Sequence, residues 1–292
     1  MIIEQRPITK AAQLNTMTFI DFFERIKMLA ISMFEWKGLP EGIKPEFLER
    51  LLFEEGMASF LNHPDYGLIV LHATPGSHLN YQDEPTKIIC SSPASINLTL
   101  ENGSECVLIK NNALCSPTVR TVSLYAQRLA EIERTIDVNL KAQKTPTLIL
   151  CTEKNRLTLK NVYNQYDGNQ PVIFGDKNLD ITGIQVLKTD APYIGADLTD
   201  LKHSIWNECM TFLGIGNANQ DKKERLVSSE VSANDEQILI GAETMLSSRK
   251  QAAKEINRIF KTEISVDLKC RKEVKNNGKI YDYSGQPSEN EL

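Results

Sequence analysis

The sequence lacks the features that mark membrane, secreted and disulfide-bonded proteins. No stretch approaches the roughly 18 consecutive apolar residues of a transmembrane helix. The opening MIIEQRPITK does not have the charged-then-apolar layout of a secretory signal. The six cysteines show no Cys-x-x-Cys and no regular spacing, which indicates free thiols in a reducing compartment. We therefore expect a protein of the cytoplasm that has no membrane partner.

Motifs for catalysis and cofactor binding are also missing. The chain has no phosphate-binding Gly-x-x-x-x-Gly-Lys-Ser/Thr loop and no Gly-x-Ser-x-Gly elbow. Gly214-Ile-Gly216 is half of a dinucleotide fingerprint, and it follows a predicted helix instead of a strand. The histidines lack metal-ligand spacing, and the cluster of Glu230, Asp235 and Glu236 is more typical of a hydrophilic loop than of a cation site. We predict no enzymatic activity, no cofactor and no metal.

Basic residues are slightly outnumbered by acidic ones. The chain holds 33 Lys and Arg against 38 Asp and Glu, a formal net charge of −5. Proteins that grip DNA tightly are usually basic, because their affinity comes from neutralised phosphates. Tight non-specific DNA binding is therefore not expected, whereas contact with DNA that slides past is compatible with this charge.

The first part of the chain is predicted to be helical. Apolar residues at helical spacing favour one helix from Thr18, with Asp21 completing a capping box, to about Trp36. A second helix is predicted to begin at Pro45 and to end before Gly56, because proline is favoured at the first helical position and glycine just past the last.

The middle of the chain changes character twice. Short alternating runs over residues 62–115, with Asn102-Gly103 between two of them, predict a small antiparallel β unit that contains a hairpin at this pair. From Pro117, apolar residues at nearly heptad spacing predict a helix of about 25 residues that stops at Pro146. The sequence does not decide whether this helix packs within one chain or between chains.

The remainder mixes helices, short strands and polar segments. Short strands are predicted at residues 147–151 and 172–174, around a helix, and two helices at 198–213 and from about Asn219. After Val227 the chain reads as a mobile polar loop, followed by a helix over residues 245–260, a strand at 264–268 and a disordered tail from Arg271. The fold class is therefore α+β.

Several runs, in fixed order, resemble the upper collar protein of small Picovirinae-type podophages, which is also called the portal or head–tail connector. They extend over most of the chain, so the resemblance is far more specific than any single short motif. In chain order they are MFEW (33–36), AQKTP (142–146), VYNQY-x-GN-x-PVIF (162–174), KTDAPY (188–193), TFLGI (211–215), NAN (217–219), KKER (222–225) and NDEQI (234–238).

The resemblance implies a portal core of long helices with an inserted β-rich wing and a C-terminal helix and strand segment. It implies a ring of twelve copies that carries double-stranded DNA into the procapsid and out of the virion. Its partners would be the packaging ATPase, the lower collar and tail proteins, the scaffold and the major capsid protein. The implied parts are residues 1–60 (N-terminal helical segment), 61–116 (wing), 117–188 (long helix and small α/β part), 189–245 (channel helices and channel loop) and 246–292 (C-terminal helix, strand and tail).

The resemblance also implies which residues face DNA. Lys202 aligns with a lysine that lines the channel of the relatives, and Lys222 and Lys223 are weaker candidates. A solvated surface lysine is the alternative for Lys202. The segment aligned with the inward channel loop, which would hinder DNA from slipping back, comprises Ser228, Ser229, Glu230, Val231, Ser232, Ala233, Asn234, Asp235, Glu236 and Gln237.

Two departures from the relatives limit what carries over. Gly216 stands where the relatives have a lysine, so a basic ring is not expected at this position. The relatives also begin with a strongly basic arm that holds a packaging RNA, whereas residues 1–13 contain only Arg6 and Lys10. RNA binding is therefore not carried over. A structural collar or adaptor without a DNA channel is the alternative function, and an enzyme of unrecognised type is a third.

Overall fold

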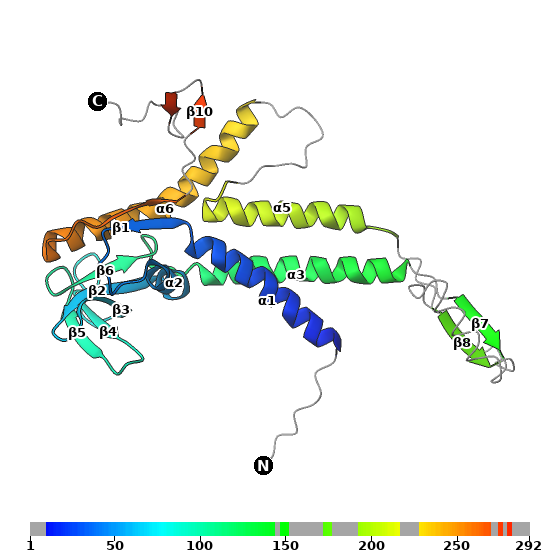
Figure 1. The fold of residues 1–292 in the computed structure, drawn as a ribbon, viewed down its shortest axis with the longest axis horizontal. Coiled ribbons are helices and arrows are strands. Elements are labelled where there is room, and N and C mark those ends of the chain that lie inside the picture. Colours follow the sequence, from blue (N-terminus) through cyan, green and yellow to red (C-terminus); the bar gives the residue numbers. More distant parts are fainter. Residues whose placement is uncertain are drawn as a thin grey trace, which may run out of the picture. The chain divides into compact units, whose positions relative to one another are not determined.

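The computed structural model describes residues 10–143, 147–151, 172–176, 192–216, 228–269, 274–276 and 279–281. The chain forms two compact units, one of residues 1–18 and 129–204 and the other of residues 19–128 and 205–292. The long helices in the described part are α1 (Lys10–Ile31), α3 (Val119–Ala142), α5 (Gly195–Leu213) and α6 (Ser228–Phe260) (Figure 1). Together with a five-stranded sheet they confirm the predicted α+β class.

The sheet belongs to the second unit and is antiparallel. Its strands lie in the order β5-β4-β3-β2-β6, so that four consecutive strands form a meander and the last strand returns to the first. The strands are β2 (Met57–His63), β3 (Gly67–Pro75), β4 (Lys87–Ser91), β5 (Asn97–Glu101) and β6 (Cys106–Lys110).

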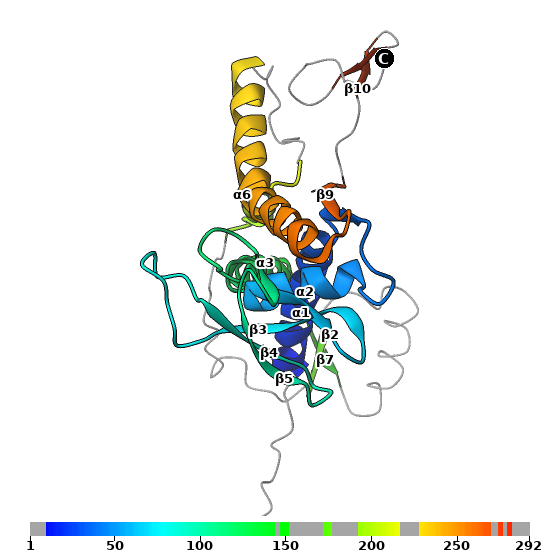
Figure 2. The ribbon, with the colours of Figure 1, turned by 90° about the vertical axis from the view of Figure 1, so that its left-hand side faces the viewer.

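The predicted hairpin at Asn102-Gly103 is wrong, although a tight turn is present there. Gly103 has a φ of +88°, yet β5 pairs with β4 and β6 pairs with β2. The reason lies in β6, whose first four residues are buried on both faces of the strand. One face lines the sheet interior and α6 packs over the strand (Figure 1), whereas the half-exposed β5 lies at the other edge of the sheet, beyond β4 (Figure 2). Strand β2 of this sheet was not predicted, because the predicted β unit began only at residue 62.

The interior of this sheet is apolar and includes two cysteines. Cys90 and Cys106 are fully buried, and both belong to one cluster with Leu61, Ile88 and Leu108. The hydrogen bond that the Cys106 thiol donates to Cys90, together with burial, raises the pKa of Cys106 far above its usual range. Among the described residues, Cys90, Cys106, Cys115 and Cys209 are free.

Helix α1 begins earlier and ends earlier than the sequence predicted. Thr18 is not a cap, since its hydroxyl donates to the Leu14 carbonyl inside the helix, where residues of good helix propensity precede it. The helix ends at Ile31 because the next residues form strand β1 (Phe34–Lys37), in which Trp36 pairs with Val266 of β9 (Ser265–Leu268). The apolar spacing of this segment therefore belongs to a strand with alternate residues buried.

Helix α2 (Pro45–Glu55) confirms the prediction for both of its ends. Pro45 occupies the first turn, and Gly56 closes the helix with a φ of +83°. The Gly56 N–H donates to the Leu52 carbonyl, and a Cβ at this glycine would lie only 2.1 Å from the Cys115 carbonyl oxygen. The close approach explains why glycine alone fits here.

Helix α6 overturns the predicted loop that follows Val227. Residues 228–237 are helical and continue into the helix predicted at 245–260, which makes one element of 33 residues. The segment contains neither proline nor glycine, it begins with serines that favour a helix start, and Glu, Ala and Gln propagate the helix. Its polar composition therefore does not indicate a lack of helical propensity. The second helix predicted from Asn219 lies outside the described residues.

The remaining strands form two small pairs. Strands β7 (Thr147–Cys151) and β8 (Val172–Asp176) pair in parallel, which confirms both predicted strands, and the helix predicted between them lies outside the described residues. Strands β10 (Val274–Asn276) and β11 (Lys279–Tyr281) pair within the tail that was predicted to be disordered. That prediction was wrong for these six positions, because Val274, Ile280 and Tyr281 supply the β-forming residues of a short hairpin.

Candidate functional site

The structure places Lys202 in an ion pair and not in open solvent. Its Nζ lies 3.0 Å from Oε2 of Glu133, so the lysine on α5 contacts α3 of the same unit. The Lys202 side chain is 26% exposed and that of Glu133 39%. The charge of this lysine is therefore largely balanced by its own subunit, a position that was not anticipated from the sequence.

Asn139 holds the same two helices together at the next contact along them. The buried Asn139 side chain donates to the Pro192 carbonyl and accepts from the N–H of Ile194, just before α5 begins. Because both amide atoms of Asn139 are used, the start of α5 is fixed against α3. This fixes the position of α5 from which Lys202 reaches Glu133.

The part of α5 that faces solvent in this unit carries acids. Asp197 and Asp200 are exposed, and Leu201 between them and the paired lysine is 47% exposed. Lys222 and Lys223 lie outside the described residues. Of the predicted channel loop, residues 228–237 form the first turns of α6, and Gln237, the only one of them whose side chain is described, is exposed.

The second unit contains its own contact between α3 and α5. The Tyr125 hydroxyl donates to Oε1 of Glu208 at 3.0 Å, and the Tyr125 ring lies 6.3 Å from that of Phe212. Burial and the neighbouring Glu208 carboxylate raise the pKa of Tyr125 to about 12. Burial likewise raises the pKa of the Cys209 thiol to about 12, so this thiol is unreactive at neutral pH.

A buried polar cluster in this second unit was missed by the sequence analysis. The side chains of Arg249 on α6 and Glu49 on α2 are both only 2% exposed, with Nη2 and Oε2 2.7 Å apart and Nε and Oε1 2.9 Å apart. Arg249 also donates to the carbonyls of Asn111 and Met245 and to the Asn111 side chain, while Trp36 donates to Glu49. The guanidinium group lies 4.0 Å from the Phe34 ring centre.

This cluster is structural. The five N–H donors of an arginine are matched here by five acceptor contacts, so Arg249 has no donor left for a ligand. The signal that could have found it was in the sequence, where an arginine interrupts the apolar stripe of Met245, Ala253 and Ile256. A charged residue at a core position of a helix has to find a buried partner.

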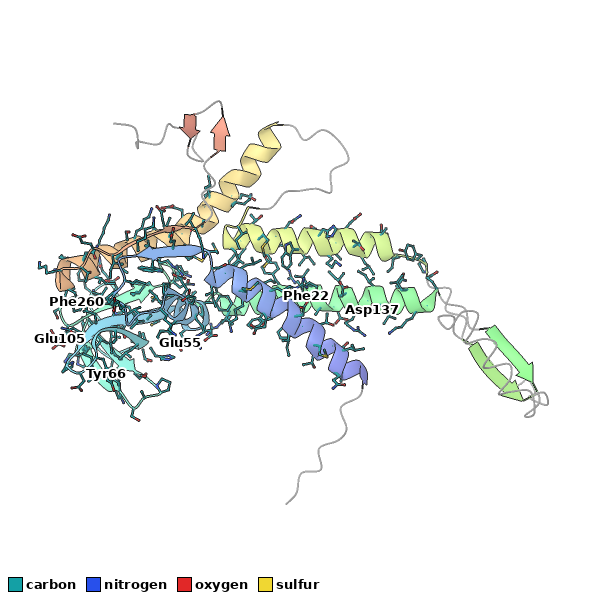
Figure 3. The ribbon with its side chains drawn as sticks, in the orientation of Figure 1. Phe22, Glu55, Tyr66, Glu105, Asp137 and Phe260 are labelled. Carbon is teal, nitrogen blue, oxygen red and sulfur yellow. The ribbon has the colours of Figure 1, made fainter. Side chains whose placement is uncertain are left out.

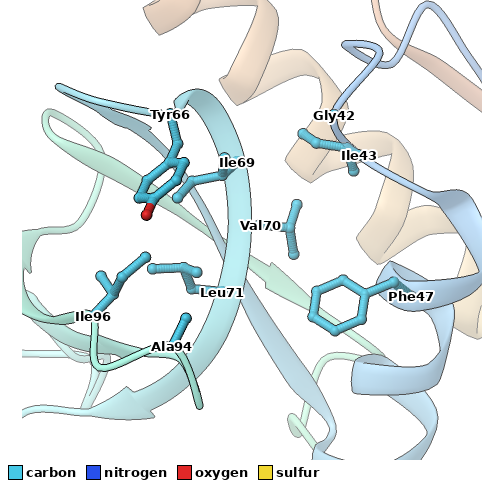
Figure 4. A pocket seen from close by; sticks show the side chains of 9 residues that line it. All are labelled: Gly42, Ile43, Phe47, Tyr66, Ile69, Val70, Leu71, Ala94 and Ile96. Carbon is cyan, nitrogen blue, oxygen red and sulfur yellow. The ribbon is translucent and has the colours of Figure 1, made fainter.

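A cavity in the second unit is apolar. It has a volume of about 240 Å³ and is bordered by Tyr66, Ile69 and Leu71 on one side and by Ile43 and Phe47 on the other, with Val70 between them (Figure 4). No carboxylate, histidine or cysteine lines it. Side chains elsewhere in the unit pack tightly against the sheet, as Phe260 does against Phe60 with ring centres 5.3 Å apart (Figure 3). The cavity offers no group for catalysis.

The described residues contain no group of three His, Cys, Asp or Glu that could hold a metal ion. No described helix has the length and hydrophobicity to cross a bilayer. The described part combines long helices with a small antiparallel sheet. The fold is that of a phage portal: it matches a chain in the portal and tail of native bacteriophage P68 with a TM-score of 0.50 and 14% identity, covering 89% of this chain and 88% of that one.

The family follows from the sequence match. The model of the family described as Phage Connector (GP10) matches residues 5–275, which is nearly the whole chain. The protein therefore belongs to the phage connector family and is a head–tail connector, a structural component of the phage virion. The resemblance inferred from the sequence runs is confirmed.

Proposed function

We propose that this connector assembles as a homo-dodecameric ring around a channel for double-stranded DNA. DNA would enter the procapsid through it during packaging and leave through it during ejection. In the host cytoplasm the ring would associate with scaffold and major capsid protein and dock the packaging ATPase, and later the lower collar and tail proteins. The observation that carries this proposal is the family match over residues 5–275, which includes the helices α1, α2, α3, α5 and α6 of the described part.

The charges on α5 support a channel wall that does not hold DNA. Each neutralised phosphate would add to an affinity that moving DNA has to overcome. In the first unit, Asp197 and Asp200 are exposed and the charge of Lys202 is balanced by Glu133. With −5 per chain, a ring of such subunits repels phosphate and lets the duplex slide.

Among the described residues, Lys202 remains the candidate for contact with DNA, as a lysine already paired with Glu133. A passing phosphate would compete with Glu133 for the ammonium group, so the contact is weaker than that of an unpaired lysine. Lys222 and Lys223 are further candidates. The barrier against backward slipping would be the first turns of α6, residues 228–237, and not a flexible loop. No packaging RNA is assigned to the N-terminal segment.

The assembly is tested by native mass spectrometry and negative-stain imaging of the purified chain. Twelve copies of 32.9 kDa give a particle of about 395 kDa with a central hole. A chain that stays monomeric or dimeric at tens of micromolar contradicts the ring.

The DNA role is tested by packaging assays in which Lys202→Gln is compared with the surface control Lys254→Gln on α6. Lys202→Gln should assemble normally and change the rate of packaging or the retention of packaged DNA, while the control should not. If neither Lys202→Gln nor removal of residues 229–241 changes packaging or retention, the protein is a structural collar without a DNA channel.

A further inference from the structure

Two helices of the second unit each leave one face uncovered. On α1, Ile20 is 48% exposed and Met28 is 65% exposed, and Glu24 between them is exposed as well. On α3, Leu124 is 62% exposed and lies between the exposed Arg120 and Arg128. We call residues 20, 24 and 28 the α1 strip and residues 120, 124 and 128 the α3 strip.

Both strips point away from the core of the unit. Helix α1 buries Phe22, Ile26 and Ala30, and α3 buries Val122 and Ala126. Each buried residue follows a strip residue by two positions, which is about 200° around an α-helix. The strips therefore lie on the outer sides of their helices, where no described residue of the same unit covers them.

The charges of the two strips complement each other. Glu24 makes no ion pair or hydrogen bond among the described residues, whereas the adjacent Asp21 is already paired with Arg25 at 2.7 Å. Arg120 and Arg128 also make no ion pair or hydrogen bond in the described part of the chain. The α1 strip is thus an acid between two apolar residues, and the α3 strip is an apolar residue between two bases.

The spacing of the strips matches as well. In both, the three residues follow at intervals of four, which is the ridge that packs into the groove of a neighbouring helix. An offset of one turn places Leu124 against Ile20 or Met28 and an arginine against Glu24, whichever way the helices run. The apolar residues in contact, Leu124 and Ile20 or Met28, would exclude water from the ion pair between Glu24 and an arginine of the neighbouring subunit.

We infer that the α1 strip of one subunit docks on the α3 strip of the next. Because the strips are different and lie on one chain, the contact is head-to-tail. Repeating it does not end at a dimer, and it gives a ring when the rotation between neighbouring subunits closes. This inference rests on the ring of the proposed function and names the surface that builds it. A nucleic acid is the other occupant that Arg120 and Arg128 could attract, and the experiment separates the two.

The test uses full-length variants that damage one strip at a time. Met28→Asp and Leu124→Asp place a carboxylate in the contact, and Leu79→Asp, at a residue 55% exposed in the segment between β3 and β4, is the matched control. Native mass spectrometry over a concentration series should show the ring for the wild type and the control. The two strip variants should need at least about thirtyfold higher concentration to associate, the effect of losing a central contact. Unchanged circular dichroism and melting temperature show that they fold.

Mixing the variants tests the direction of the contact. The Met28→Asp chain keeps an intact α3 strip and the Leu124→Asp chain keeps an intact α1 strip, so an equimolar mixture should give one-to-one heterodimers and no ring. Glu24→Arg should also weaken assembly, and adding Arg120→Glu and Arg128→Glu to it should restore rings.

Three results overturn the inference. The first is that Met28→Asp or Leu124→Asp forms rings at the same concentration as the wild type. This result contradicts the contact between the strips but not the ring of the proposed function. The second is a charge reversal that leaves assembly intact but alters DNA packaging, since the arginines then face nucleic acid. The third is a wild type that forms no ring, which contradicts the proposed function itself.

Discussion

Two regions of the molecule use an ion pair between helices, and they use it differently. Arg249 and Glu49 form a pair in which both side chains are 2% exposed and every guanidinium donor has an acceptor. Lys202 and Glu133 form a pair that is 26% and 39% exposed, with a single contact of 3.0 Å. Buried charge pairs are costly to break, whereas exposed pairs contribute little. The comparison separates a fixed structural connection from a contact that can exchange its partner.

The largest effect is expected from Glu49→Ala, which tests whether the buried pair of Arg249 and Glu49 is a fixed structural connection. It leaves the buried Arg249 charge without a counterion and removes the acceptor of the Trp36 indole, so the free energy of unfolding should fall by about 3–5 kcal/mol. Urea unfolding followed by fluorescence measures this loss. The double replacement Glu49→Leu with Arg249→Met should recover most of it, because no unpaired charge remains. If Glu49→Ala alone lowers the free energy of unfolding by less than about 1 kcal/mol, its pair with Arg249 is not a fixed structural connection.

A smaller effect is expected from Trp36→Phe. The change keeps the aromatic ring in the core but removes the N–H that donates to Glu49 Oε1 at 2.8 Å. Because Arg249 still serves this carboxylate, the free energy of unfolding should fall by about 1–2 kcal/mol. Thermal unfolding compares it with Phe34→Leu, which removes a ring near Arg249 without removing a hydrogen bond. Trp36→Phe should destabilise the chain less than Glu49→Ala does, and an equal loss from the two variants would contradict this prediction.

Lys202→Met should have little effect on the stability of the isolated chain. Its pair with Glu133 is partly exposed, so the free energy of unfolding should change by less than about 1 kcal/mol. The same urea unfolding experiment measures it, with Lys254→Met on α6 as the control. If the change destabilises the chain as strongly as Glu49→Ala does, Lys202 is a structural residue and its proposed role toward DNA loses its basis.

The smallest effect is the response of the two pairs to salt. Raising NaCl from 0.1 to about 1 M shortens the screening length from about 10 Å to about 3 Å, which weakens exposed pairs far more than buried ones. The cost of Lys202→Met should disappear, a change of a few tenths of a kcal/mol, while that of Glu49→Ala should persist. Unfolding curves of both variants and the wild type at the two salt concentrations provide the check. Equal salt dependence would show that the pairs do not differ in exposure in solution.

Local signals in the sequence predicted part of this structure. Pro45 and Gly56 defined α2, and the seam from Pro117 predicted α3, because start, stop and periodicity are properties of neighbouring residues. The family was predicted from runs spread along the chain. These features need no knowledge of distant contacts.

The features that were missed depend on residues far apart in the chain. Trp36 lies in a strand only because Val266 pairs with it. Strand β6 leaves β5 because its edge pairs with β2 while α6 packs over it. The balance of the Lys202 charge by Glu133 could not be read from either residue alone. Helical propensity at residues 228–237 was underestimated because polar composition was taken as evidence for a loop.

The pairing of β1 with β9 has a consequence for how the protein is made. Phe34 and Trp36 are synthesised well before Val266 and Leu268, the residues with which their strand pairs. Until then β1 is an unpaired edge with two large apolar side chains, a form prone to aggregate or to recruit a chaperone. A chain whose synthesis stops before β9 would stay in that form. Covering the apolar side chains of β1 therefore requires synthesis to proceed through β9.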